Sequence, residues 1–75
     1  MDWQKIKDKI EEYCKKKYVE KGVPPIFRKN NIIYHLKLNE EEVKCLRRAL
    51  ISLLKEGKLV KHGSKTYRWN TTPHG

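Results

Sequence analysis

Residues 39–57 show the clearest alternation of apolar and polar positions in the chain. Apolar side chains recur there every three or four positions and form one stripe, made of Val43, Leu46, Leu50, Leu53 and Leu54. Asn39 and Glu42 have the spacing of a capping box, which satisfies backbone N–H groups at the start of a helix. Gly57 can adopt the left-handed conformation that ends one. The pattern therefore predicts a helix over 39–56, with its apolar stripe packed against a core.

The opposite side of this predicted helix is polar and mostly basic. At about 100° per residue, five side chains fall on that side: Glu41, Lys44, Arg48, Ser52 and Lys55. Arg47 and Ile51 lie on its flank. This side of the helix is expected to remain exposed and to meet a negatively charged partner.

Two further segments with helical periodicity precede it. The first runs from Asp2, the expected N-cap, to about Lys17, with an apolar side made of Trp3, Ile6, Ile10, Tyr13 and Cys14. The second, capped by Asn30 or Asn31, runs to about Lys37 and directs inward Ile32, Ile33 and Leu36, with Tyr34 and His35 more exposed. Only Leu38 and Asn39 separate this second helix from the helix over 39–56. The two helices must therefore cross at a steep angle, as in a helix-turn-helix.

Strands are predicted where the spacing of apolar positions changes or where prolines prevent a helix. Pro24 and Pro25 prevent helix after Gly22, so Ile26 and Phe27 are expected to form a short edge strand. After Gly57 the period becomes two, and segments 58–62 and 65–69 predict a hairpin with the two-residue loop Gly63-Ser64.

The expected register of that hairpin follows from its two-residue loop. It pairs His62 with Lys65, Val60 with Tyr67, and Lys58 with Trp69, so that Val60, Tyr67 and Trp69 share one face. Leu59 is expected to fill the corner after the long helix. We expect a single domain over 1–70 and a disordered tail at 71–75.

The order of helix, short strand, helix, tight turn, helix and hairpin predicts an α+β fold. Residues 26–69 resemble a winged helix-turn-helix domain, through the long helix with paired aliphatics, the Leu-Leu-x-x-Gly exit, the basic hairpin and the aromatic return strand. The size resembles that of compact winged-helix regulators of archaeal viruses and plasmids. The resemblance implies three helices, with 39–56 as a recognition helix in the major groove of double-stranded DNA. It also implies that hairpin 58–69 is a wing, with Gly63-Ser64 at its tip.

The charge distribution supports a nucleic-acid partner. The chain of 75 residues carries a net charge of +9, and segments 26–38 and 58–75 contain bases but no acid. Phosphate contacts are predicted for Arg28, Lys29, Lys61 and Lys65. Further contacts with the DNA backbone are predicted for Arg47, Ser52, Lys55, His62 and Ser64. Arg47 has a second option, an ion pair with an acid of its own helix.

Base reading is predicted for Lys44 and Arg48, because an arginine can bind guanine through two hydrogen bonds. Glu41 lies on the same side of the helix. Its carboxylate either remains solvated or accepts a hydrogen bond from a cytosine amino group.

Other functions find less support in the sequence. No enzyme motif and no metal-ligand spacing occurs, so we expect neither catalysis nor a cofactor. No apolar run is long enough for a membrane span, and Cys14 and Cys45 are expected to be free thiols in a reducing cytoplasm. A protein-interaction module or homodimer, using Ile51, Tyr18 and Val19, remains an alternative, as does RNA binding. The favoured interpretation is that the chain is a cytoplasmic, sequence-specific DNA-binding transcription regulator.

Overall fold

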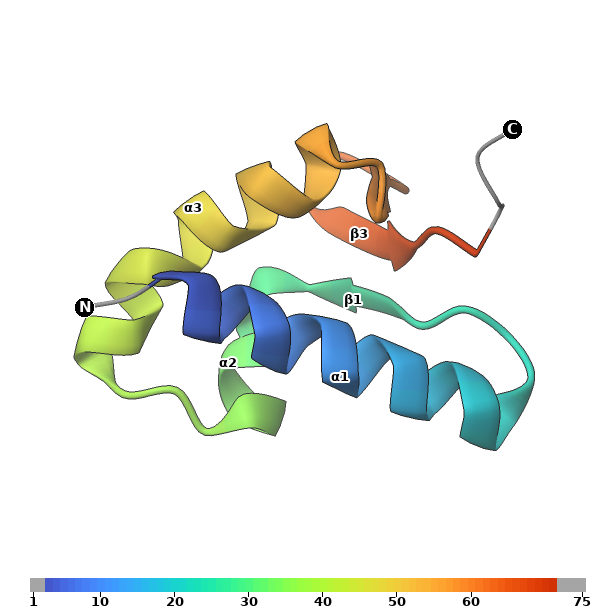
Figure 1. Ribbon diagram of the computed structural model, residues 1–75, viewed down its shortest axis with the longest axis horizontal. Helices are drawn as coiled ribbons and strands as arrows, with labels where there is room; N and C mark the ends of the chain where they lie inside the picture. The colour runs from blue at the N-terminus through green and yellow to red at the C-terminus, as the bar shows by residue number, and fades with distance from the viewer. Residues whose placement is uncertain (1–2, 72–75) are drawn as a thin grey trace.

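The computed structural model describes residues 3–71 and shows an α+β arrangement (Figure 1). Its elements, in chain order, are α1 (Trp3–Lys21), β1 (Ile26–Arg28), α2 (Lys29–Leu36), α3 (Glu40–Lys55), β2 (Leu59–Lys61) and β3 (Thr66–Trp69). The three strands form one antiparallel sheet in the order β1-β3-β2. The predicted order of elements is thus confirmed over this part of the chain, and β1 is an edge strand as expected.

The start and end of α3 follow the predicted signals. The Asn39 side chain accepts a hydrogen bond from the Glu42 N–H at 2.8 Å, and the Glu42 carboxylate accepts one from the Asn39 N–H at 3.0 Å. At the other end, Gly57 has a φ of +77°, in the left-handed region. Leu46, Leu50 and Leu53 of the predicted stripe are buried, together with Ala49. Local sequence therefore determined both the limits of α3 and its inner face.

Helix α1 is one turn longer than the sequence pattern predicts. It continues past Lys17 to Lys21, and the Gly22 N–H donates to the Tyr18 carbonyl at 2.8 Å. Gly22 has a φ of +72°, so the helix ends at the first residue that adopts a left-handed conformation without cost. The N-cap predicted at Asp2 lies outside the described residues.

Helix α2 begins earlier than predicted, which corrects the capping role of Asn30 and Asn31. Arg28, in an extended conformation, is the N-cap, so strand β1 leads directly into the helix. Asn31 instead occupies the third helical position, where its side-chain oxygen accepts from the Arg28 N–H at 3.0 Å. The early start places Arg28 and Lys29 at the junction between sheet and helix.

The hairpin register is shifted by one residue from the predicted one. Leu59 pairs with Trp69, Val60 with Arg68 and Lys61 with Tyr67, so the loop contains residues 63–65. The His62 N–H donates to the Thr66 carbonyl at 3.0 Å, closing a three-residue loop in place of the predicted two-residue turn. Since side chains alternate between faces, this shift moves Val60 to the outer face. The predicted shared face is therefore wrong for Val60, whereas Tyr67 and Trp69, two positions apart on β3, do share a face.

Leu59 takes the inner position that had been assigned to Val60. Leu59 and Trp69 are both buried, and Leu59 fills the corner after α3 as expected. The inner face of the sheet also carries Phe27, whose ring stacks on that of Tyr67 with the ring centroids 5.8 Å apart. The core lies between this face and helices α1 and α3, and α2 contributes the fully buried Ile32.

Helices α1 and α3 pack against each other, and ion pairs join the exposed edges of this contact. Lys7 pairs with Glu56, and Lys9 with Glu42 at 2.9 Å. Lys58 reaches Glu11 at 2.7 Å and Glu56 at 3.3 Å. The hydrogen bonds from Lys9 and from the Asn39 N–H hold the pKa of Glu42 below its usual range. Three glutamates are thus paired with lysines along the line where α1 meets α3 and β2.

Glu56 makes the stability of the fold sensitive to acid. The hydrogen bond from Lys7, supported by those from Ser52 and Lys58, lowers the pKa of its carboxyl from 4.5 to about 2. A carboxyl with a depressed pKa in the folded state stabilises that state above its unfolded pKa and loses this effect as pH falls. We therefore expect the Glu56 contribution to be full at pH 7 and to disappear progressively between about pH 4.5 and 2.

The measurement is chemical unfolding of the wild type and Glu56→Gln at pH 7 and pH 2. Glu56→Gln should be less stable than the wild type at pH 7, and the two proteins should converge at pH 2. Glu12→Gln is the control, since Glu12 is exposed on α1 and no ion pair links it to another residue of 3–71. If the difference in unfolding free energy between the wild type and Glu56→Gln stayed constant with pH, the lowered pKa of Glu56 would be contradicted.

Candidate nucleic-acid interface

Two adjoining hollows lie where α2, α3 and the hairpin meet. The hairpin hollow, of about 380 Å³, is lined by Arg28, Lys29, Asn30, Ser64, Lys65 and Tyr67. The helix hollow, of about 400 Å³, is lined by Lys29, Arg47, Leu50, Ile51, Leu54, Lys61 and Tyr67. Because Lys29 and Tyr67 line both, the hollows form one continuous surface, which we call the basic face.

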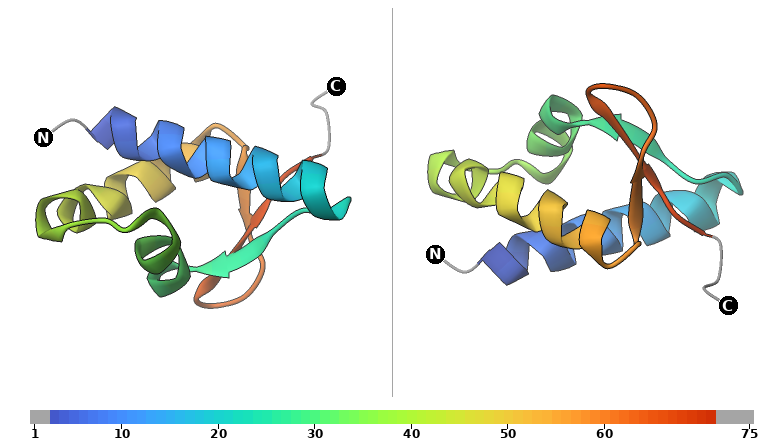
Figure 2. Two further views of the ribbon diagram at one scale, coloured as in Figure 1. Left: turned by 90° about the horizontal axis from the view of Figure 1, so that it is seen from below. Right: turned by 90° about the horizontal axis from the view of Figure 1, so that it is seen from above.

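The pairing of the strands builds the basic face. Antiparallel pairing of β1 with β3 sets Phe27 beside Tyr67 and Arg28 beside Thr66. The start of α2 therefore lies next to the hairpin loop, although the two segments are more than thirty positions apart in the sequence. Seen from above, α2 and the hairpin loop lie on one side of α3, and α1 lies on the other (Figure 2).

The observed register also fixes the position of Lys61. Its Nζ lies 4.7 Å from the centre of the Tyr67 ring and donates a hydrogen bond to the Ser64 carbonyl at 3.2 Å. A cation over an aromatic face is attracted by the electron-rich ring, so these two contacts hold Lys61 beside the hollow. Under the predicted register, Lys61 and Tyr67 would have pointed to opposite faces.

The basic face is positively charged without compensating acids. Five cations reach it from three separate segments, namely Arg28, Lys29, Arg47, Lys61 and Lys65. None of the described residues that line either hollow is acidic. The glutamates that pair with lysines across elements lie instead along the contact of α1 with α3 and β2. Folding thus separates the charges and leaves the positive excess on this surface.

The two neighbouring arginines of α3 point to different sides of the helix. Arg47 lines the helix hollow beside Lys61 and Tyr67. The Arg48 guanidinium lies over the Trp3 ring of α1, 5.2 Å from the ring centre. Sequence periodicity placed Arg48 at the middle of the exposed side, but it did not show that the start of α1 packs beside this part of α3.

The remaining predicted site residues are distributed more widely. Ser52 is half-buried and donates to the Glu56 carboxylate at 3.0 Å, so its hydroxyl already serves the α1–α3 contact. Glu41, Lys44 and Lys55 are exposed on α3, and His62 is exposed at the end of the hairpin. Of the twelve residues predicted, the structure brings together in the two hollows Arg28, Lys29, Arg47, Lys61, Ser64 and Lys65.

The sequence pattern did not indicate Asn30, Leu54 or Tyr67 as site residues, although all three line the hollows. Tyr67 was expected to cover the core, yet it is only half-buried and forms the common wall of both hollows. The signal that would have found it is the cross-strand pair of Lys61 with Tyr67, which depends on the loop length of the hairpin.

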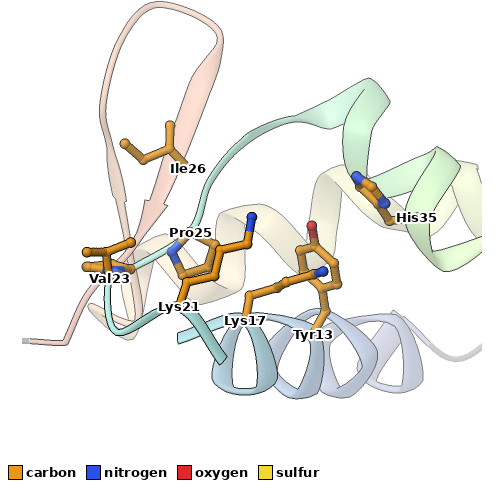
Figure 3. A pocket seen from close by; sticks show the side chains of 8 residues that line it. Tyr13, Lys17, Lys21, Val23, Pro25, Ile26 and His35 are labelled. Atoms are coloured by element: carbon orange, nitrogen blue, oxygen red, sulfur yellow. The ribbon is translucent and has the colours of Figure 1, made fainter. Parts of the chain in front are cut away.

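A further hollow, of about 300 Å³, lies between α1, the connection 22–25 and α2 (Figure 3). Tyr13, Lys17 and Lys21 border it from α1, and His35 borders it from α2. The Tyr13 and His35 rings stack with their centroids 5.4 Å apart, which joins the two helices. This hollow is separate from the basic face and contains fewer cations.

The described residues hold no group of three or more His, Cys, Asp or Glu side chains placed to bind a metal ion. Cys14 and Cys45 are both free, and burial raises the pKa of the Cys14 thiol to about 12. None of the helices within residues 3–71 combines the length and the apolar character needed to cross a bilayer.

Comparison with known proteins gives no family for this chain. No protein-family model matches it, and no curated protein or solved structure is significantly similar to it. A function for this chain must therefore be inferred from the geometry and charge of the basic face.

The different surroundings of the two arginines predict different effects on stability. Arg48→Ala removes a cation from an aromatic ring and should lower the free energy of unfolding by about 0.5–1 kcal/mol. Arg47→Ala removes an exposed cation for which residues 3–71 provide no ion pair, so its effect should stay within about 0.5 kcal/mol. Urea unfolding of both variants tests this, and a larger loss for Arg47→Ala would show that the arginines are assigned to the wrong sides.

Proposed function

We propose that this chain is a winged helix-turn-helix protein that binds double-stranded DNA sequence-specifically, as a small transcription regulator would. In this proposal α3 is the recognition helix and the β2–β3 hairpin is the wing. The order of the elements, the short connection between α2 and α3, and the hairpin that follows α3 all support this assignment. The fold alone leaves the partner open, since one fold serves many functions.

The observation that carries the proposal is the convergence of five cations on one acid-free surface. They come from the β1–α2 junction, from α3 and from the hairpin, so the charge follows no single stretch of sequence. Phosphate contacts require positive charge on flexible side chains at several points along a duplex. The basic face supplies these points from α3 itself and from the β1–α2 junction and the hairpin beside it.

We assign base reading to Lys44 and Arg47, and not to Arg48. Lys44 is exposed in the first half of α3, and Arg47 lies one turn further along, facing the hairpin. Arg48 is drawn toward Trp3, so binding a base would cost it that contact. Backbone contacts are assigned to Arg28, Lys29, Lys61 and Lys65.

Duplex DNA fits the surface better than RNA does, and a protein partner is distinguished by experiment. The major groove of A-form RNA is too deep and narrow for a helix, and the basic face offers a single aromatic ring, Tyr67, for base stacking. A protein partner with an acidic surface would also suit the charge, so the binding assays below include an acidic polypeptide as competitor.

Binding should weaken steeply with salt. If about four to six phosphates are neutralised, the logarithm of the binding constant should fall with the logarithm of salt concentration at a slope of about −4 to −5. Fluorescence anisotropy on a labelled duplex between low and physiological salt measures this slope. Polyglutamate should not displace the duplex at equal charge concentration. A slope near zero, or equal affinity for polyglutamate, would refute the proposal.

Single substitutions should separate backbone contacts from base contacts. Lys65→Ala should weaken binding to every duplex alike and reduce the salt slope by about one, whereas Lys16→Ala, an exposed lysine of α1, should change neither. Arg47→Ala should flatten the preference among sequences, with a loss of about 1–3 kcal/mol on the preferred one. If Lys65→Ala and Lys16→Ala lost the same amount of binding affinity, DNA binding would depend only on the net charge of the protein.

A further inference from the structure

Ile51 is an exposed apolar side chain in a basic environment. It retains 42% of its accessible surface and lines the helix hollow together with Arg47 and Lys61. On the exposed side of α3, the positions one turn away from it are Arg47, Arg48 and Lys55, all cations. An exposed isoleucine is ordinary on most protein surfaces, but here it interrupts the surface that carries the excess charge.

We propose that Ile51 contacts the C5-methyl group of a thymine in the major groove, and that it thereby selects thymine-containing sites. This inference rests on the proposed function, since it requires α3 to enter the groove. The base edges of the major groove present hydrogen-bond donors and acceptors, and thymine adds a C5-methyl group, the only methyl group on the four standard bases. Contact with this methyl group would remove apolar surface of Ile51 from water without leaving a polar group unpaired.

The local structure gives Ile51 a defined position for such a contact. A β-branched side chain in a helix has essentially one preferred χ1 rotamer, so Ile51 does not need to be ordered on binding. Its neighbours Leu50 and Leu54 are buried and half-buried, which anchors this turn of α3 to the core. Arg47 and Lys55, one turn before and after, are placed to hold the phosphates or bases that flank the contacted thymine.

The test replaces thymine by deoxyuridine, which pairs identically but lacks the methyl group. Duplexes that the wild type prefers are first selected from a random pool at low salt. Each thymine of the selected site is then replaced singly by deoxyuridine, and the dissociation constant is measured for the wild type and for Ile51→Ala. Ile26→Ala is the matched control, because Ile26 is 50% exposed on β1 and lines neither hollow of the basic face.

At one or two positions, deoxyuridine should weaken binding by the wild type and by Ile26→Ala about fourfold, as expected when one buried methyl contact is lost. The same replacement should change binding by Ile51→Ala less than 1.5-fold, roughly the error of the measurement. On the thymine duplex, Ile51→Ala should bind about as weakly as the wild type binds the deoxyuridine duplex. Circular dichroism confirms that the variants are folded.

Three results would overturn the inference. If deoxyuridine weakens the wild type and Ile51→Ala equally, another residue reads the methyl group. If Ile51→Ala binds all duplexes as tightly as the wild type, the exposed isoleucine serves a different partner. In both cases duplex binding persists and the proposed function stands, whereas failure of the wild type to bind any duplex would refute both.

Discussion

The pairing of β3 with both of its neighbours is the constraint on which the rest of the structure depends. Strand β3 lies between β1 and β2, so its register sets the position of the α2 start on one side and of the hairpin on the other. Tyr67 occupies the middle of this arrangement, opposite both Phe27 and Lys61. One residue of register decides whether Lys61 shares the face of Tyr67 or points to the opposite face of the sheet.

Folding also separates the charges of a chain that mixes acids and bases along much of its length. Lysines of α1 and Lys58 pair with Glu11, Glu42 and Glu56 along the α1–α3 contact, where each pair is at least partly exposed. Exposed pairs contribute little stability individually, so their larger effect is on the distribution of potential. They confine the paired acids to one side and leave the opposite side, with Arg47 and the hairpin lysines, uncompensated.

The elements with strong local signals were predictable, and those that depend on distant partners were not. Asn39, Glu42 and Gly57 determine the ends of α3 through contacts within a few residues, which the sequence displays directly. The α2 cap was misplaced because its start depends on β1 pairing with β3. In the candidate site, six of the predicted residues converge. That Arg47 lines the helix hollow while Arg48 lies over Trp3 could be known only from the packing of α1 on α3.

The sequence by itself determined the order of the elements, the inner stripe of α3 and the acid-free composition of segments 26–38 and 58–75. These features follow from backbone preferences and side-chain periodicity, which act over a few residues. Only the tertiary structure decided that Tyr67 forms a wall of the basic face, that Lys61 lies over it and that Arg48 faces Trp3. The physical reason is that register and helix rotation are fixed by burial of Leu59, Trp69 and Phe27 in a shared core, a contact between segments far apart in the chain.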